Sequence, residues 1–450
     1  MQKADPFVVL CWENIPGHIP PFHISPRQLT IGVHQPYIFN VNPGSEMPDI
    51  MMPAGEYDLR DTLRQAGIVE NPDLIVVWTS ALGVNLPTNL SAFRCPKLLF
   101  CGDTHHMQHP IRHMIDYARA ENFDAVATTC DRHHLHWFQA SGFANCAWLP
   151  GISVAHATLP PWQTQRSDQV AFIGQTGTLH GWRGALLERI AATGTPVNRG
   201  LATRVQAAAE YASSVISFNG SLNGDLNMRV FEVLSAGGFL LTDRLSPQAG
   251  FELLLRPGQD CETYQDADEL LDKVAFYRRL PAAALRIAQQ GASTYQREHL
   301  PERVIAVLRD WMLDGRLPDR FNPRHDLRLA TSLAAAGDLA LRISVYERLQ
   351  ELQQLQPGSS VLVSPGWLAA SAMDIADLVR LRLTVIGPAP ELRAAAAAAS
   401  MLDQLAFIDA DAAAGQNWDI VLTASADAAN EPWRSSAGRV MFADFEGETS

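Results

Sequence analysis

The stretch from Asn219 to Arg244 constrains this chain more than any other part of its sequence. It begins as a polar loop with two glycines, continues into a short helical segment and ends in an apolar run. The apolar run Val215–Phe218 precedes it, so the order is strand, loop, helix, strand. That order is typical of a ligand-binding edge at the carboxyl ends of a parallel sheet. We therefore expect an α/β protein that binds a ligand against this helix.

The loop and helix carry four candidates for binding a phosphorylated ligand: Asn223, Asn227, Arg229 and Glu232. The free N–H groups of a first helical turn favour a phosphate, and a nearby arginine adds charge-assisted hydrogen bonds. Asp225 and Asn227 are also suited to cap the helix. Glu232 lies in a mostly apolar helix and could accept hydrogen bonds from both hydroxyls of a ribose. The alternatives are an ordinary salt-bridged carboxylate for Glu232 and pairing of Arg229 with Asp225.

A second glycine-containing turn lies earlier in the chain, over Phe172–Gly177, and precedes a predicted helix over Arg183–Ala192. A strand that ends in such a turn before a helix can present backbone N–H groups to a pyrophosphate. Gly174 and Arg183 are therefore further candidates for binding the same ligand.

The stretch and its continuation contain an ordered set of short patterns: Arg229-x-Phe231-Glu232, Ala236–Gly238, Leu240–Asp243, Gly250–Glu252, Arg256–Asp260 and Tyr264 before a helix over Asp266–Arg279. This set resembles the second domain of glycosyltransferases with two facing Rossmann-like domains, the GT-B architecture. Within that group it is most similar to the spore-maturation CgeB-like branch of the group-1 enzymes. The resemblance covers roughly Asp168 to Trp311. Many group-1 enzymes have a further glutamate in the loop, at the position that Gly224 occupies here.

The resemblance implies a bacterial glycosyltransferase that uses a nucleotide sugar as donor and has no tightly bound cofactor. Glu232 would hold the ribose, and Arg229 would contact the diphosphate beside the backbone of Asn223–Asn227. The acceptor, a glycan, a lipid-linked glycan or a protein, would enter from the first domain. The alternative is a non-catalytic module of the same fold that binds nucleotide sugars or takes part in assembly, and Gly224 favours this alternative.

Composition limits the class of protein. A chain of 450 residues is too long for one core and suits two or three domains. The formal net charge of −13 argues against nucleic acid as a partner. Six cysteines show no Cys-x-x-Cys spacing, as in proteins of a reducing cytoplasm. The sequence shows neither a signal-peptide pattern nor an apolar run long enough to span a bilayer, so we expect a cytoplasmic protein.

Apolar runs that alternate with amphipathic segments predict a parallel sheet in the first part of the chain. The predicted strands are Phe7–Trp12, Leu74–Thr79, Lys97–Cys101, Ala125–Thr129 and Cys146–Leu149. The predicted helices are Leu59–Ala66, Ile111–Glu121 and Arg132–Ser141. We expect an α/β fold with two facing Rossmann-like domains plus a small C-terminal helical and α/β extension. Its parts are an acceptor domain over 1–160, a donor domain over 161–318, a helical hairpin over 319–356 and a degenerate Rossmann-like unit over 357–450.

Two catalytic candidates follow the strand Lys97–Cys101, at the edge that would face the cleft between the two domains. His105 could deprotonate an acceptor hydroxyl or stabilise the leaving diphosphate, and Asp103 is another candidate base. The alternative is a cluster that only stabilises the loop. His109 and His113 have a spacing that suits metal ligands, but Pro110 is expected to start the helix and exclude His109 from its first turn. No metal site is therefore predicted.

The last part of the chain contains five short apolar runs: Val361–Ser364, Leu381–Ile386, Leu405–Asp409, Asp419–Thr423 and Val440–Phe442. Their spacing resembles the first half of a methyltransferase-like Rossmann domain. The turn after the first run, Ser364–Trp367, lacks the acidic residue and glycine cluster that would hold S-adenosylmethionine. Methyl transfer is thus a weaker alternative, and we expect a structural or partner-binding role.

Overall fold

The computed structural model describes residues 4–13, 23–33, 48–102, 104–105, 109–152, 163–176, 181–221, 223–323, 339–349, 358–363, 372–373, 375–376, 378, 380–387, 390–398, 405–423 and 437–442. The chain divides into two compact units. The first unit contains Met1–Ser221, Asp225–Arg244 and Gly250–Pro323. The second contains Leu222–Gly224, Leu245–Ala249 and Arg324–Ser450.

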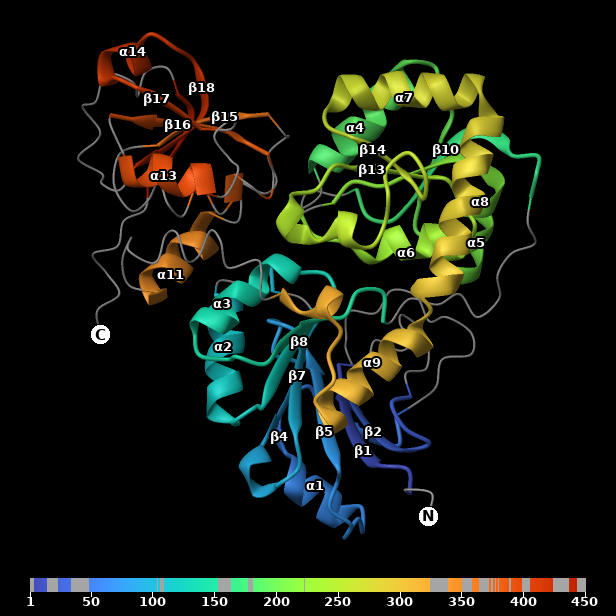
Figure 1. Cartoon of the computed structure of the whole chain (residues 1–450), viewed down its shortest axis with the longest axis vertical. Helices are drawn as coiled ribbons and strands as arrows, with labels where there is room; N and C mark the ends of the chain where they lie inside the picture. The colour runs from blue at the N-terminus through green and yellow to red at the C-terminus, as the bar shows by residue number, and fades with distance from the viewer. Residues whose placement is uncertain are drawn as a thin grey trace. The chain divides into compact units, whose positions relative to one another are not determined.

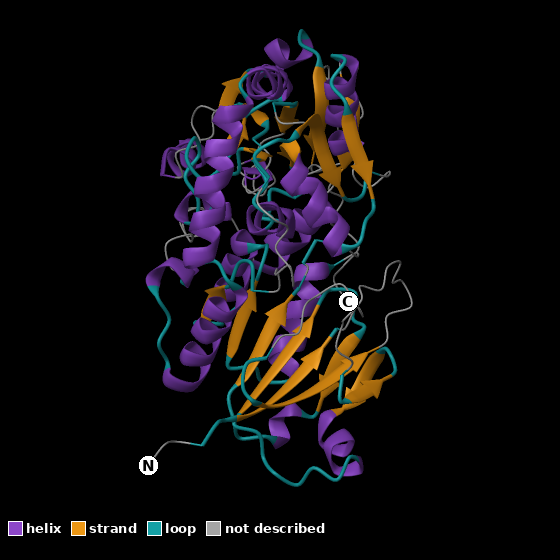
Figure 2. Cartoon of the chain, turned by 90° about the vertical axis from the view of Figure 1, so that its right-hand side faces the viewer, coloured by secondary structure: helices purple, strands orange, loops and turns teal. Residues whose placement is uncertain are grey.

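The first unit contains a sheet of seven described strands in the order β3-β2-β1-β5-β7-β8-β9. All of these strands pair in parallel, and Figure 2 shows them running in one direction. They are β1 (Phe7–Trp12), β2 (Arg27–Val33), β3 (Ile50–Met52), β5 (Leu74–Thr79), β7 (Lys97–Cys101), β8 (Ala125–Thr128) and β9 (Cys146–Trp148). Every residue of β1, β5 and β7 is buried, because central strands of a parallel sheet are covered on both faces.

The elements between these strands begin where local chemistry favours a helix. Helix α1 (Leu59–Gln65) is capped by Asp58, whose side chain accepts from the Asp61 N–H. Pro110 is the first residue of α2 (Pro110–Ala120), as predicted, and His109 is its N-cap. The helix predicted over 132–141 consists of a 3-10 turn, η2 (Arg132–His134), followed by α3 (Leu135–Ala140). Strands β4 (Gly55–Asp58) and β6 (Asn85–Thr88) form a separate parallel pair.

A second parallel sheet lies in the same unit, with its five described strands in the order β11-β10-β12-β13-β14. They are β10 (Ser167–Ile173), β11 (Val197–Gly200), β12 (Ser214–Phe218), β13 (Leu240–Asp243) and β14 (Glu262–Tyr264). The helices of this part are α4 (Gly181–Ala192), α5 (Arg204–Ser213), α6 (Met228–Ser235), α7 (Ala267–Arg279) and α8 (Pro281–Glu298).

Helix α9 (Pro301–Asp314) follows the second sheet in sequence but packs against the first (Figure 1). Val304, Leu308 and Trp311 belong to the same buried cluster as residues of β1 and β5. The indole N–H of Trp311 also donates a hydrogen bond of 3.0 Å to Asn145 Oδ1, just before β9. The chain thus returns to the first sheet, as the resemblance to GT-B enzymes implies.

The second unit contains a third parallel sheet, whose five described strands have the order β17-β16-β15-β18-β19. They are β15 (Ser360–Val363), β16 (Arg382–Ile386), β17 (Leu405–Ile408), β18 (Trp418–Thr423) and β19 (Ala437–Phe442), close to the predicted runs. The helices described here are α11 (Leu339–Leu349), α13 (Pro390–Ala398) and α14 (Ala410–Ala414). The turn Ser364–Trp367, where a methyltransferase would bind its cofactor, lies outside the described residues.

The parallel sheets and covering helices confirm the predicted α/β class. The sequence analysis did not predict the strands β2, β3, β11 and β14, which enlarge both sheets of the first unit, or the helix α8. Of the helical hairpin predicted over 319–356, the described part is α11 with the short turn η6 (Asp319–Phe321). The predicted domain limits at 160, 318 and 356 stay predictions. Among the described helices, none has the length and apolar character needed to cross a bilayer.

Candidate functional site

Two arginines meet at the carboxyl end of β10. The guanidinium carbon of Arg229, on α6, lies 4.3 Å from the ring centroid of Phe172, and that of Arg183, on α4, lies 5.6 Å from it. Both distances are within the range of cation–π contacts. Two residues that the sequence analysis assigned to the same ligand thus lie on one aromatic ring.

The two arginines are held by uncharged oxygens. Arg229 donates from Nε to the Ile173 carbonyl at 3.0 Å and from Nη1 to Asn219 Oδ1 at 2.9 Å. Arg183 donates from Nε to the Gly220 carbonyl at 2.9 Å. Burial lowers the pKa of Arg183 to about 10, and the charge of Arg229 acts in the same direction. The nearby carboxylates of Asp225 and Asp243 oppose this shift. A bound anion would add to their effect and further offset the repulsion between the two guanidinium groups.

Gly174 makes room for one of these arginines. A β-carbon at this position would lie 2.1 Å from Arg229 Nη2, much closer than van der Waals contact. The φ angle of Gly174 is +156°, a conformation that residues with a β-carbon rarely adopt. Its N–H donates to the Gly200 carbonyl at 2.8 Å. The predicted glycine turn is therefore needed for both backbone conformation and arginine placement.

Asn227 occupies the start of α6 without capping it. It is the N-cap residue, with an extended backbone, but its side chain makes no capping hydrogen bond. The expectation that the Asn227 side chain caps the helix is therefore wrong. Its amide oxygen and nitrogen are both buried and have no hydrogen-bond partner among the described residues. Buried polar atoms of this kind commonly mark the position of a ligand or an ordered water.

Glu232 is half-buried on α6, one turn after Arg229. Burial lowers the pKa of Arg204 to about 10, and the charge of Glu232 opposes this shift. Glu232 thus has a nearby cation on α5, as the salt-bridge alternative requires. Arg204 was not predicted as a site residue. The sequence offered a signal, since Thr203 and Gln206 form a capping box that places Arg204 in the first turn of α5.

The loop between β12 and α6 is fixed by a buried carboxylate at the end of β13. Asp243 accepts from the Ser221 N–H at 2.8 Å and from the Ser221 hydroxyl at 2.5 Å. Asn219 Nδ2 donates to Thr242 Oγ1 at 3.0 Å. Burial raises the pKa of Asp243, although the hydrogen bonds oppose this shift. This network holds Asn219, the residue that binds Arg229, in place.

Two predicted residues are not placed beside the arginines. Asn223 belongs to the second compact unit, so its position relative to the arginines is not defined. Asp103 lies outside the described residues.

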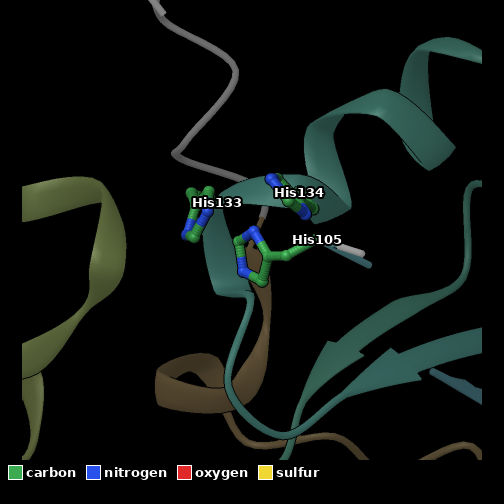
Figure 3. A group of neighbouring side chains, drawn as sticks. All are labelled: His105, His133 and His134. Atoms are coloured by element: carbon green, nitrogen blue, oxygen red, sulfur yellow. The ribbon is translucent and has the colours of Figure 1, made fainter. Parts of the chain in front are cut away.

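His105 belongs to a buried cluster at the carboxyl edge of the first sheet. Its ring lies near those of His133 and His134, which form part of η2 after β8 (Figure 3). His105 Nε2 lies 2.5 Å from Asp131 Oδ1, and the Thr104 hydroxyl donates to Asp131 Oδ2 at 2.9 Å. The sequence analysis proposed His105 as a catalytic residue but assigned no role to Asp131.

Burial decides the charge state of this cluster. It lowers the pKa of His133 to about 3 and that of His134 well below the ordinary value. Burial alone would raise the pKa of Asp131, but the adjacent His105 ring lowers it below the usual value for an aspartate. The cluster therefore combines the neutral imidazoles of His133 and His134 with an ionised Asp131 carboxylate at neutral pH.

Part of the chain matches the model of a known protein family. Residues 157–310 match a family model described as glycosyl transferase-like. A search of curated proteins gives no match. The chain thus contains a glycosyltransferase-like domain, while the finer CgeB-like resemblance stays a prediction.

Several solved structures are similar to this chain at low sequence identity. TarM is 10% identical and aligns over 55% of this chain and 54% of its own length, with a TM-score of 0.41. The chain therefore spans about half the length of TarM. The sucrose-phosphate synthase of Thermosynechococcus elongatus is 12% identical and aligns over 67% of this chain and 96% of its own, with a TM-score of 0.44. HepE of Anabaena, solved in complex with UDP-glucose, is 13% identical and aligns over 69% and 100%, with a TM-score of 0.43.

Proposed function

We propose that this protein is a glycosyltransferase of the GT-B type, which moves a sugar from a nucleotide-sugar donor to an acceptor in the cleft between its two Rossmann-like domains. The glycosyl transferase-like match over residues 157–310 supports the class of reaction. The observation that carries the donor site is the convergence of Arg183 and Arg229 on Phe172.

The diphosphate of the donor would bind at this pair of arginines. Both guanidinium groups contact the ring of Phe172, and a diphosphate offers oxygens to both. The first turn of α6, which carries Arg229, adds the positive end of the helix dipole. The buried amide of Asn227 and the backbone at Gly174 are further contacts that we propose for the donor. As the glycosidic bond breaks, these groups would stabilise the charge of the departing diphosphate.

The ribose of the donor would bind at Glu232. The carboxylate lies on the same helix as Arg229, one turn further on, which matches the separation between a ribose and its diphosphate. The nearby charge of Arg204 would help to orient the carboxylate, which would accept hydrogen bonds from the two hydroxyls.

His105 and Asp103 are the groups that we propose to act on the acceptor. The hydrogen bond from His105 to Asp131 orients the imidazole and stabilises its protonated form, as a base requires. His105 would take the proton from the acceptor hydroxyl, or support the leaving diphosphate, and Asp103 is the alternative base. The acceptor would be a glycan, a lipid-linked glycan or a protein.

Calorimetric titration of the full chain with a panel of sugar nucleotides tests the donor site. We expect the wild type to bind one class of donor, and Glu232→Gln to bind it at least tenfold more weakly, a loss of about 1.4 kcal/mol. Glu252→Gln is the matched control, because Glu252 is an exposed glutamate on the short helix η5 (Phe251–Leu253). Equal binding by wild type and Glu232→Gln would remove Glu232 from the site, and failure of the wild type to bind any sugar nucleotide would refute the proposal.

A non-catalytic nucleotide-sugar-binding module is the second candidate, and one observation favours it. Gly224 stands where many related enzymes have a glutamate, and its φ of +68° suits glycine better than a residue with a side chain. The two proposed functions differ in whether the bound donor is consumed. Release of nucleoside diphosphate with transfer of the sugar to an acceptor supports the enzyme, whereas donor binding without hydrolysis or transfer supports the module.

A further inference from the structure

Three histidines from two loops gather at the carboxyl edge of the first sheet. His105 follows β7, while His133 and His134 follow β8, and Figure 3 shows the three rings around one point. One ring nitrogen from each residue lies within 4.8 Å of the other two. Zinc binds imidazole nitrogens at ~2.1 Å, which places them roughly 3–4 Å apart. Small rotations of the side chains would therefore bring all three nitrogens to one ion.

The hydrogen bonds around the cluster set which nitrogens carry lone pairs. An ionised carboxylate only accepts, so the 2.5 Å contact to Asp131 places the hydrogen of His105 on Nε2. The Thr104 hydroxyl gives its hydrogen to Asp131, so it must accept from His134 Nδ1 in their 2.5 Å contact. The lone pairs thus lie on His105 Nδ1 and His134 Nε2. Metal-binding histidines are commonly oriented by a carboxylate in this way.

His133 supplies an independent observation. It is 1% exposed, and its Nδ1 and Nε2 both lack a hydrogen-bond partner among the described residues. Leaving a polar ring nitrogen buried and unpaired destabilises a fold. A bound cation would accept the lone pair of one of these nitrogens. Metal binding would therefore explain why this ring is buried without a hydrogen-bond partner among the described residues.

We propose that His105, His133 and His134 bind a divalent transition metal ion of the zinc class, with Asp131 and Thr104 orienting two of the ligands. Imidazole nitrogens suit zinc and its neighbours in the first transition row, whereas magnesium and calcium prefer oxygen ligands. The carboxylate of Asp131 offsets part of the charge of the ion. The site joins the loop after β7 to η2. It goes beyond the proposed glycosyl transfer: with the ion bound, His105 is a ligand and the role of base passes to Asp103.

Metal binding by the full chain tests this site without an activity assay. The protein is stripped with a chelator, dialysed and titrated with Zn²⁺ against a competing dye, and with Co²⁺ by visible absorption. We expect a single Zn²⁺ per chain, tetrahedral Co²⁺ bands and a higher melting temperature with Zn²⁺. His133→Gln should lose all three effects, and Asp131→Asn should bind Zn²⁺ about 10- to 100-fold more weakly.

The control is the double variant His109→Gln/His113→Gln. These histidines lie at the start of α2 with ring centroids 6.0 Å apart, and they are a potential source of adventitious binding. The control should retain the bound ion. The proposal is wrong if the control loses the ion, if His133→Gln binds Zn²⁺ as the wild type does, or if Co²⁺ bound to the wild type shows only octahedral bands. The wild-type Co²⁺ spectrum decides the question even where a variant fails to fold.

Discussion

Arg229 occupies the space that any side chain at Gly174 would need, since a β-carbon there would lie 2.1 Å from Nη2 of the arginine. The conflict involves the far end of a flexible side chain, so Arg229 is able to move away. Its departure would cost the cation–π contact with Phe172 and the hydrogen bond to Asn219. A substitution at Gly174 therefore acts on the candidate ligand site more than on the fold.

We expect Gly174→Ala to remain folded with a loss of about 1–3 kcal/mol from the strained backbone. Donor affinity should fall at least tenfold, because Arg229 no longer points at the ligand. Gly181→Ala is the control, since a β-carbon at Gly181 meets open space. Denaturant unfolding and donor titration of both variants measure the two effects, and unchanged donor affinity of Gly174→Ala would contradict the argument.

Gly291→Ala should destabilise the first unit more than an exposed helical substitution. Gly291 lies inside α8, where a β-carbon would meet the Asp260 carbonyl oxygen at 2.2 Å and Leu234 of α6 at 2.7 Å. Helix α8 would have to move away from the Asp260 backbone and from α6, at a cost of about 1–3 kcal/mol despite the better helix propensity of alanine. Gln289→Ala, exposed on the same helix, should leave the unfolding free energy nearly unchanged. An unchanged unfolding free energy of Gly291→Ala would show that the helices adjust their packing without cost.

Trp311 should be the main anchor of α9 on the first sheet. It is 4% exposed within the buried cluster, and its indole bonds Asn145. Trp311→Ala should cost about 3–5 kcal/mol through the cavity it leaves. Trp311→Phe should cost less, because much of the packing remains and the lost hydrogen bond is worth about 1 kcal/mol. Urea unfolding monitored by intrinsic fluorescence measures the unfolding free energy of both variants. If Trp311→Ala and Trp311→Phe lose the same free energy, the hydrogen bond and not the packing anchors α9.

His299 should make the first unit less stable in mild acid. It is 2% exposed, and burial lowers its pKa below the ordinary value, although the Leu254 carbonyl opposes the shift. The unfolded chain then binds the proton more readily, so stability is present above about pH 6.5 and is lost as pH falls toward the folded pKa. The slope approaches about 1.4 kcal/mol per pH unit. His299→Gln should reduce the difference in unfolding free energy between about pH 7 and about pH 5, and an identical difference in both proteins would show that His299 does not contribute.

The central strands could be predicted because burial on both faces leaves a continuous apolar run. Phe7–Trp12 and Leu74–Thr79 were predicted with the limits that the structure shows. Edge strands carry a weaker signal. Only the last three residues of β2 are buried, and β11 has a single apolar residue and no buried one. Such strands form because a neighbouring strand pairs with them, which local sequence does not reveal.

The residues of the candidate sites also divide into those that local sequence reveals and those that only the fold brings into place. Arg229 and Glu232 could be assigned from one helix, because their spacing is set by helical geometry. Arg204 and Asp131 come from other elements, and their contacts with Glu232 and His105 depend on how the chain folds. Asp131 was nonetheless within reach of sequence reasoning, since it follows β8, whose carboxyl end lies beside that of β7 in a parallel sheet.

The return of α9 to the first sheet also determines the order in which the molecule can mature during synthesis. Val304, Leu308 and Trp311 complete the core around β1 and β5, so the first-made sheet keeps one apolar face uncovered until the ribosome has translated past Trp311. The second sheet, whose strands lie within 167–264, is complete earlier. Nascent chains cut before α9 should therefore require a chaperone for their N-terminal half, while their middle portion already resists proteolysis.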